Sequence, residues 1–170
     1  MSVIQPTTQI KSQPNQITIN KTFNETWEDM VEFISTSYFG IDAFEKESGL
    51  LTLSFGEENP GRYIDCGEIH GPNYSGPLTN AANTIPVTSH VLEGRMNVFL
   101  HSESPNVTTV RVTARYVYTI QDAQFRQIWA FNSNTSDTKS LNQAQGVTCV
   151  SKQVAENELL EGIKFTASGK

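Results

Sequence analysis

Charged residues are scarce in this chain of 170 residues, where they make up 18% of the total, and Ser, Thr, Asn and Gln fill many polar positions instead. The 12 Lys and Arg residues are scattered without a basic run, and the net charge is −6. A protein that binds the phosphate backbone of nucleic acid carries a basic patch or stripe. The composition therefore excludes nucleic acid as a partner and is compatible with an extracytoplasmic protein.

Long apolar runs are also absent. No stretch approaches the roughly 20 apolar residues of a membrane-spanning helix, and residues 1–14 lack the apolar core of a signal peptide. We therefore expect no membrane-spanning helix. A chain of this length fits a single domain that buries about two-thirds of its unfolded surface, so it needs no metal ion to fold.

Cysteine is limited to two residues, Cys66 and Cys149. A disulfide between them would close a loop of roughly 80 residues and contribute about 4 kcal/mol on the chain-entropy model. Two free, buried thiols are equally compatible with the cysteine count.

The amino-terminal segments alternate between irregular and periodic patterns. Residues 1–15 carry two prolines and no periodicity, which predicts a flexible leader or tether. A short strand is expected at 17–20, followed by a helix that Asn24 caps and Gly40 ends. Helical spacing is seen in the apolar residues Trp27, Met30, Val31, Ile34 and Tyr38.

The remaining segments are mostly strands. We expect a hairpin over 41–56 with its turn at 47–49, and then a loop over 57–86 that is either functional or tied down. Alternating patterns predict strands at 91–101 and 109–120, each with one buried face.

The carboxy-terminal part contains one more predicted strand, at 125–131, and a polar turn at 132–140. Ser151 is expected to cap a last helix with the stripe Ala155, Leu159, Gly162 and Ile163.

Segregated helices beside an antiparallel sheet give an α+β fold, in which the sheet packs on an N-terminal and a C-terminal helix. The helix-grip arrangement fits this order of elements best. The predicted organisation is a tether over residues 1–15 and a single domain over 16–166.

The stretch RYIDCGEIH, residues 62–70, has the density of chemically active side chains expected of a catalytic loop or a metal site. A cysteine nucleophile needs a histidine base, and His70 lies near Cys66. No third catalytic group and no oxyanion-hole motif accompany them, which favours a structural cysteine.

Metal and acid–base chemistry have weaker support. The candidate zinc ligands lack the close CxxC or HxxxH spacing that forms a site; they are Cys66, His70, His90, His101 and Cys149. A glycosidase-like acid pair would have to come from Asp65, Glu68, Glu57 and Glu58, and acids in a polar loop are by default solvated. We therefore predict no catalytic residue, no metal and no cofactor.

Aromatic residues could line a cavity for a small apolar ligand between sheet and helix, and they could equally form the core. They are Trp27, Tyr38, Phe39, Trp129 and Phe131. A carrier or sensor of such a ligand is the alternative function.

Three segments carry a more specific pattern: FNETWEDMVEFIS with the following GIDAFEKESGLLTLSF, then RYIDCG, and finally TCVSKQVAENELL. The pattern falls on Trp27, Gly40, Ile41, Gly49, Leu51, Leu53, Phe55, Tyr63, Ile64, Asp65, Cys66, Gly67, Cys149, Ser151 and Glu156. It resembles small proteobacterial envelope lipoproteins with a helix-grip domain, akin to that of the outer-membrane assembly lipoprotein BamC. The match spans most of residues 17–165, although the pattern has Thr-Gly where this chain has Lys152 and Gln153.

The resemblance implies a periplasmic domain held at the outer membrane by a lipidated N-terminal cysteine, which is missing from this sequence. It also implies a Cys66–Cys149 disulfide and no catalytic residue, because such domains act by binding other envelope proteins. We therefore expect a non-enzymatic scaffold or protein-interaction module, in which Tyr63 and Ile64 hold the loop onto the core and Gly67 permits a turn.

Overall fold

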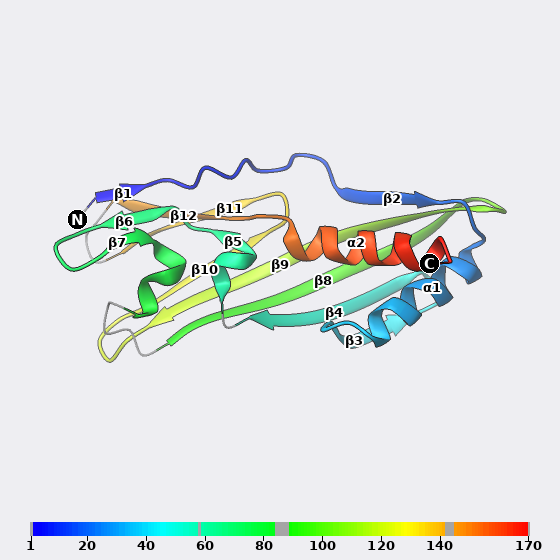
Figure 1. The fold of residues 1–170 in the computed structure, drawn as a ribbon, viewed down its shortest axis with the longest axis horizontal. Coiled ribbons are helices and arrows are strands. Elements are labelled where there is room, and N and C mark those ends of the chain that lie inside the picture. Colours follow the sequence, from blue (N-terminus) through cyan, green and yellow to red (C-terminus); the bar gives the residue numbers. More distant parts are fainter. Residues whose placement is uncertain (1, 58, 84–88, 142–144, 170) are drawn as a thin grey trace. The chain divides into compact units, whose positions relative to one another are not determined.

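The structure, a computed structural model, describes residues 2–57, 59–83, 89–141 and 145–169. Its elements in chain order are β1 (Ser2–Ile4), β2 (Asn15–Ile19), α1 (Phe23–Ser35), β3 (Gly40–Glu45), β4 (Leu50–Glu57), η1 (Pro60–Arg62), β5 (Ile64–Asp65), β6 (Glu68–His70), β7 (Ser75–Pro77), η2 (Leu78–Asn83), β8 (Ser89–Ser104), β9 (Val107–Gln121), β10 (Arg126–Asn132), β11 (Ser136–Ser140), β12 (Gly146–Ser151) and α2 (Val154–Ala167) (Figure 1). Two helices and mostly antiparallel sheets confirm the predicted α+β class. Neither helix in the described residues is long and apolar enough to cross a membrane.

The chain divides into two compact units. One, which we call the disulfide unit, comprises Met1–Ser12, Gly56–Gly94 and Arg115–Val154; the other, the helix unit, comprises Gln13–Phe55, Arg95–Ala114 and Ala155–Lys170. The strands β8 and β9 contribute residues to both units. The single domain over 16–166 stays a prediction.

The main sheet has the strand order β10-β9-β8-β4-β3, with β2 paired to β9. Over 92–100 of β8 and 110–120 of β9 every second residue is buried, as the alternating sequences predict, and Met96, Val98, Val110 and Val112 are each at most 1% exposed. The predicted β3–β4 hairpin is also confirmed, and Gly49 has a φ of 73° in its turn.

Helix α1 begins with a capping box that corrects the predicted cap at Asn24. The Thr22 hydroxyl accepts from the Glu25 N–H at 3.2 Å, and the Glu25 carboxylate accepts from the Thr22 N–H at 3.0 Å. This reciprocal pair satisfies two backbone donors at once, so it fixes the start of the helix two residues before Asn24. The helix ends at Ser35 rather than at Gly40, which begins β3.

Both helices pack within the helix unit, where they lie over its strands (Figure 1). The buried stripe of α1 includes Trp27, Met30 and Ile34, and that of α2 includes Leu159 and Ile163. Two positions of the predicted α1 stripe are more open, since Val31 is 37% and Tyr38 is 48% exposed.

Gly162 lets the two helices approach closely, because a Cβ there would come within 2.1 Å of the Phe33 ring. Helix α2 begins at Val154, so the predicted cap at Ser151 is wrong. Ser151 ends β12 instead, and its hydroxyl accepts from the Gln153 N–H.

Two parts of the predicted leader make contacts with residues far away in the sequence. Ser2–Ile4 form β1, which pairs antiparallel with β6. Asn134 also donates to the Lys11 carbonyl at 2.6 Å. These long-range contacts have no periodic signature in the leader itself, so the sequence pattern missed them.

Two further segments of the disulfide unit contain strands that the sequence pattern did not predict. The expected polar turn contains a strand, because Ser136–Ser140 form β11 and pair with β12. The expected loop over 57–86 is built from short elements that are tied down: β5 pairs with β12, and β6 pairs with β1 and β7. Residues 58 and 84–86 of that loop lie outside the described residues.

Candidate functional site

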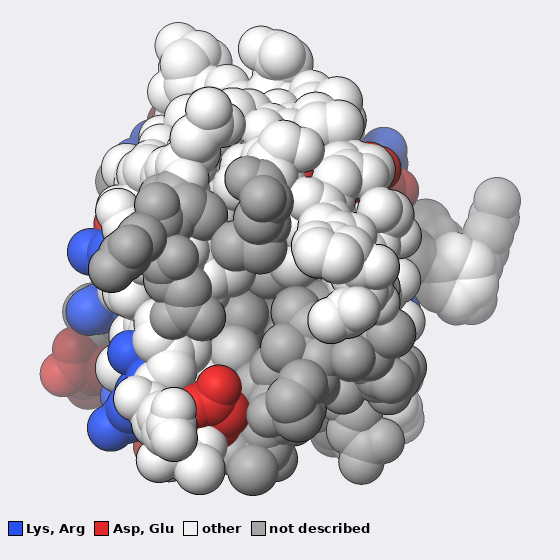
Figure 2. All heavy atoms as spheres, turned by 90° about the vertical axis from the view of Figure 1, so that its left-hand side faces the viewer, with Lys and Arg blue, Asp and Glu red and all other residues white. Residues whose placement is uncertain are grey.

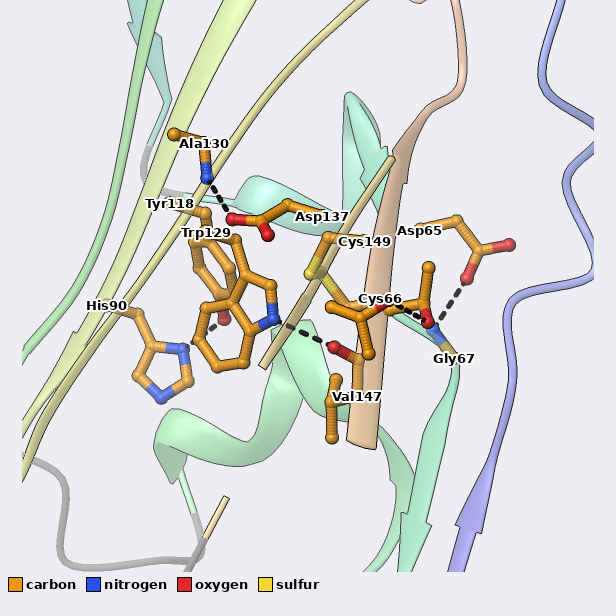
Figure 3. The surroundings of a disulfide bond; sticks show 12 residues. Asp65, Cys66, Gly67, His90, Tyr118, Trp129, Ala130, Asp137, Val147 and Cys149 are labelled. Atoms are coloured by element: carbon orange, nitrogen blue, oxygen red, sulfur yellow. Dashed lines mark hydrogen bonds between the residues drawn. A yellow bond between two sulfur atoms is a disulfide. The ribbon is translucent and has the colours of Figure 1, made fainter. Parts of the chain in front are cut away.

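The RYIDCGEIH stretch is anchored in the disulfide unit. Cys66 forms a disulfide with Cys149, which lies within β12 rather than at the start of the last helix (Figure 3). Both half-cystines are buried, at 2% and 0% exposure, and Tyr63 and Ile64 are fully buried as predicted. A sulfur in this bond is not a thiolate, so Cys66 cannot attack a substrate while the disulfide is intact.

The disulfide lies beside a buried aromatic cluster (Figure 3). Trp129 is fully buried and donates its indole N–H to the Val147 carbonyl at 2.9 Å. Its ring is 5.7 Å from that of Tyr118, centroid to centroid. Asp137 accepts from the Ala130 N–H at 2.9 Å. These contacts join β10 to β11 and β12 and make this region a packed core.

The candidate aromatics therefore split between core and surface. Trp129, Phe131, Trp27 and Phe39 are buried, whereas Tyr38 is 48% exposed and donates to the Glu158 carboxylate. A pocket of about 250 Å³ lies in the disulfide unit, and its lining is aliphatic and polar. Its walls are Ile4, Gln5, Thr7, Thr8, Ile64, Asp65, Cys66, Gly67, Glu68, Pro77, Thr79 and Lys152.

The histidines stand in separate surroundings. His70 lies 3.0 Å from Glu68, and His101 stacks on Phe99 with a centroid distance of 6.1 Å. His90 hydrogen-bonds the Tyr118 hydroxyl at 2.7 Å. Burial lowers the pKa of His90 and raises that of Tyr118, so both groups are neutral near pH 7. Across the ranges that the structure describes, no three His, Cys, Asp or Glu side chains are grouped to hold a metal ion.

The acids considered for a catalytic pair have different contacts in the structure. Glu68 faces His70, and Asp65 binds backbone and hydroxyl donors. Glu58 and the side chain of Glu57 lie outside the described residues.

Asp65 links the N-terminal segment, through Thr8, to the loop that contains Cys66. Its carboxylate accepts from the Gly67 N–H at 2.9 Å, the Thr8 hydroxyl at 2.8 Å and the Thr8 N–H at 3.1 Å. Burial alone would raise the pKa of Asp65, but these hydrogen bonds and the charge of Lys152 together lower it below its ordinary value. The ionised carboxylate is therefore the form that stabilises the fold.

The lowered pKa of Asp65 predicts that the folded protein loses stability in acid and that Asp65→Asn makes this loss smaller. The contribution of Asp65 is complete above the ordinary pKa of 3.8 and is lost as the pH falls through the lower folded value. Urea unfolding at pH 5 and pH 3 should show a smaller drop in midpoint for Asp65→Asn than for the wild type. Glu93→Gln, which neutralises an exposed carboxylate of the same unit, is the control. Equal drops in the wild type and Asp65→Asn would contradict this role.

Gln153 lies in the turn between β12 and α2. Its φ is 64°, in the left-handed region that favours glycine. The side chain is 9% exposed and donates its amide N–H to the Ser133 carbonyl. The turn between β12 and α2 therefore has a backbone conformation that favours glycine, and the Gln153 amide adds a hydrogen bond.

A pair of substitutions separates these two effects. Gln153→Ala removes the hydrogen bond and keeps the backbone strain, and we expect it to cost about 1–2 kcal/mol in the free energy of unfolding. Gln153→Gly loses the same bond but relieves the strain, so it should be more stable than Gln153→Ala by about 1 kcal/mol. Urea unfolding of both variants tests this order, and an alanine variant at least as stable as the glycine variant would refute it.

The exposed edge of the main sheet offers an interaction surface that the sequence did not mark. β3 stands at the end of the strand order, and all six of its residues are exposed. Ile41 is 46% exposed, and Phe44 is 70% exposed. An edge strand presents unpaired backbone groups that can pair with another chain.

A bulge in β3 brings its two large apolar side chains to one face. The register skips Asp42, so that Ile41 lies opposite Leu53 and Phe44 opposite Leu51. Directly opposed residues share a face, and Leu51 and Leu53 are buried. Ile41 and Phe44 therefore both point to the core side of the sheet. Strict alternation would have placed them on opposite faces, so only the observed register reveals the pair.

Figure 2 shows a contrasting surface, the face toward the N-terminal strand β1 with β6 and β7, where the described side chains are mostly uncharged.

Comparisons of the chain with family models, with curated proteins and with solved structures found no match.

Proposed function

We propose that this protein is a non-enzymatic protein-interaction module of the bacterial cell envelope, with a helix-grip arrangement of sheet and helices. It works in the periplasm and is held at the outer membrane as a lipoprotein through an N-terminal lipid tether. The binding surface is the edge strand β3. The localisation and the tether rest on the resemblance of Trp27, RYIDCG and TCVS to small envelope lipoproteins.

The observation that carries the proposal is the exposure of β3. Its side chains are exposed at every position, and the apolar pair Ile41 and Phe44 points to one face at the end of the sheet. Edges of this kind bind extended partner segments through main-chain hydrogen bonds, while pockets or patches on one face select the side chains. The disulfide supports a compartment in which such bonds persist.

The test compares three forms of the chain as bait in a periplasmic extract. The wild type and Phe165→Ser should capture the same partner. Phe165 is also a large exposed side chain, at 60%, but it belongs to helix α2 and not to β3. The double variant Ile41→Ser/Phe44→Ser should lose at least about 90% of that partner. Retention of the partner by the double variant would overturn the proposal.

A further inference from the structure

We propose that the partner of the β3 edge is an extended segment in which apolar residues alternate with Lys or Arg. This inference rests on the proposed function and adds the chemical class of the partner. It follows from the one-sided apolar pair on β3 and from the charge around it.

Alternation in the partner follows from the geometry of strand addition. A strand that pairs with β3 continues the sheet and points every second side chain to the core side. On that side it meets Ile41 and Phe44, whose exposed surface gains from apolar contact. The remaining side chains of the added strand point to the opposite face, where polar or charged groups stay in water.

The sign of the charge follows from the acids of the hairpin and of helix α1. Asp42 and Glu45 lie on β3 itself, and they accept hydrogen bonds from the neutral hydroxyls of Ser54 and Ser48, which leave their charge in place. The turn adds Glu47 and Lys46, so residues 42–47 carry three acids and one base. Helix α1 has no Lys, Arg or His and carries four acids, Glu25, Glu28, Asp29 and Glu32, of which Asp29 is paired with Lys21 at 2.8 Å. Charge complementarity therefore favours a basic partner.

The same charges disfavour a second copy of the chain as the occupant. Full-length antiparallel pairing of β3 with itself would set Asp42 opposite Ala43 of the other copy and beside that copy's Asp42, roughly 6 Å away by strand spacing. Like charges this close lie well inside the Debye length of about 8 Å at physiological salt. A basic segment replaces this repulsion with attraction.

Synthetic octapeptides provide the test, with amide chemical shifts of the 15N-labelled protein as the readout. One peptide alternates lysine with valine, a second alternates glutamate with valine, and a third alternates lysine with serine. The lysine–valine peptide should bind at least about tenfold tighter than either of the others, because only it satisfies both the charge and the apolar pair. Its shifts should centre on β3.

Variants assign the two contributions. Ile41→Ser/Phe44→Ser should weaken the lysine–valine peptide about tenfold, and Asp42→Asn/Glu45→Gln should weaken it several-fold and reduce the salt dependence. Phe165→Ser should leave the affinity unchanged. Equal affinity for the lysine–valine and glutamate–valine peptides, or shifts centred outside β3, would overturn the inference.

Two further outcomes keep this inference distinct from the proposed function. If the extract partner is lost with Ile41→Ser/Phe44→Ser but no peptide preference appears, the edge binds a partner of other chemistry, and only the inference fails. Sedimentation velocity tests whether a second copy of the chain binds the β3 edge instead. A dimer that forms with increasing concentration and is lost in Ile41→Ser/Phe44→Ser would also overturn the inference.

Discussion

Replacing Cys66 and Cys149 together with alanine is expected to lower the free energy of unfolding by about 4 kcal/mol. The disulfide closes a loop with a sequence separation of 83, and on the chain-entropy model a loop of this length restricts the unfolded chain by about that amount. Both half-cystines are buried, so alanine also leaves a small cavity in place of the two sulfur atoms. Comparison with the reduced wild type separates the effect of the cross-link from that of the cavity.

Urea unfolding with and without reductant measures this effect. The reductant should lower the midpoint of the wild type and leave Cys66→Ala/Cys149→Ala unchanged, which controls for any effect of the reductant on the rest of the chain. Thiol titration of the unreduced, denatured protein should find no free thiol. Two titratable thiols, or a variant that unfolds at the wild-type midpoint, would contradict the structural role of the bond.

Gly67→Ala is the second substitution with a large expected effect, a loss of about 2–4 kcal/mol. Gly67 has a φ of 69°, and a Cβ there would lie 2.0 Å from the Ile4 carbonyl oxygen. The left-handed conformation alone costs a residue with a Cβ about 1–2 kcal/mol. The clash is with backbone, so β1 must also shift away from β6 and lose part of its pairing.

Gly56→Ala is the matched control, because a Cβ at Gly56 meets only the Leu92 carbonyl at an ordinary 3.6 Å. We expect a change within about 0.5 kcal/mol for this variant. Hydrogen exchange adds a local readout: Gly67→Ala should reduce protection of the β1 and β6 amides more than that of β9. Equal stability of the two alanine variants would show that the N-terminal segment does not pack against Gly67 as the structure has it.

Elements with a strong period could be predicted from the sequence. The alternating residues of β8 and β9 and the turn at Gly49 follow local rules, because burial on one face imposes the pattern and a left-handed turn favours glycine. The capping box was also readable, since Thr22 and Glu25 stand three residues apart, and a search for that spacing would have replaced Asn24 as the cap.

The remaining elements depend on partners far away in the sequence. β5 has two residues, β6 has three, and each exists because a distant strand pairs with it. β12 is not marked in the sequence, because Ser151 fits a helix cap as well as a strand end. The left-handed residue that separates the strand from the helix is Gln153, so no glycine marks the boundary.

The candidate interaction surface was missed for a related reason. Ile41 and Phe44 are three residues apart, which is the wrong spacing for one face of a regular strand. They share a face only because the bulge at Asp42 shifts the register. The observed register of β3 therefore marks the site that the experiments test.

Site-specific photo-crosslinking in the living cell tests the central claim, that the β3 edge binds an envelope protein, most directly. The residue p-benzoylphenylalanine is placed at position 44 in one strain and at position 165 in another, since both native phenylalanines are exposed, at 70% and 60%. We predict a covalent adduct with an envelope protein from position 44 and none of that size from position 165. No adduct from position 44, or the same adduct from both positions, would contradict the claim.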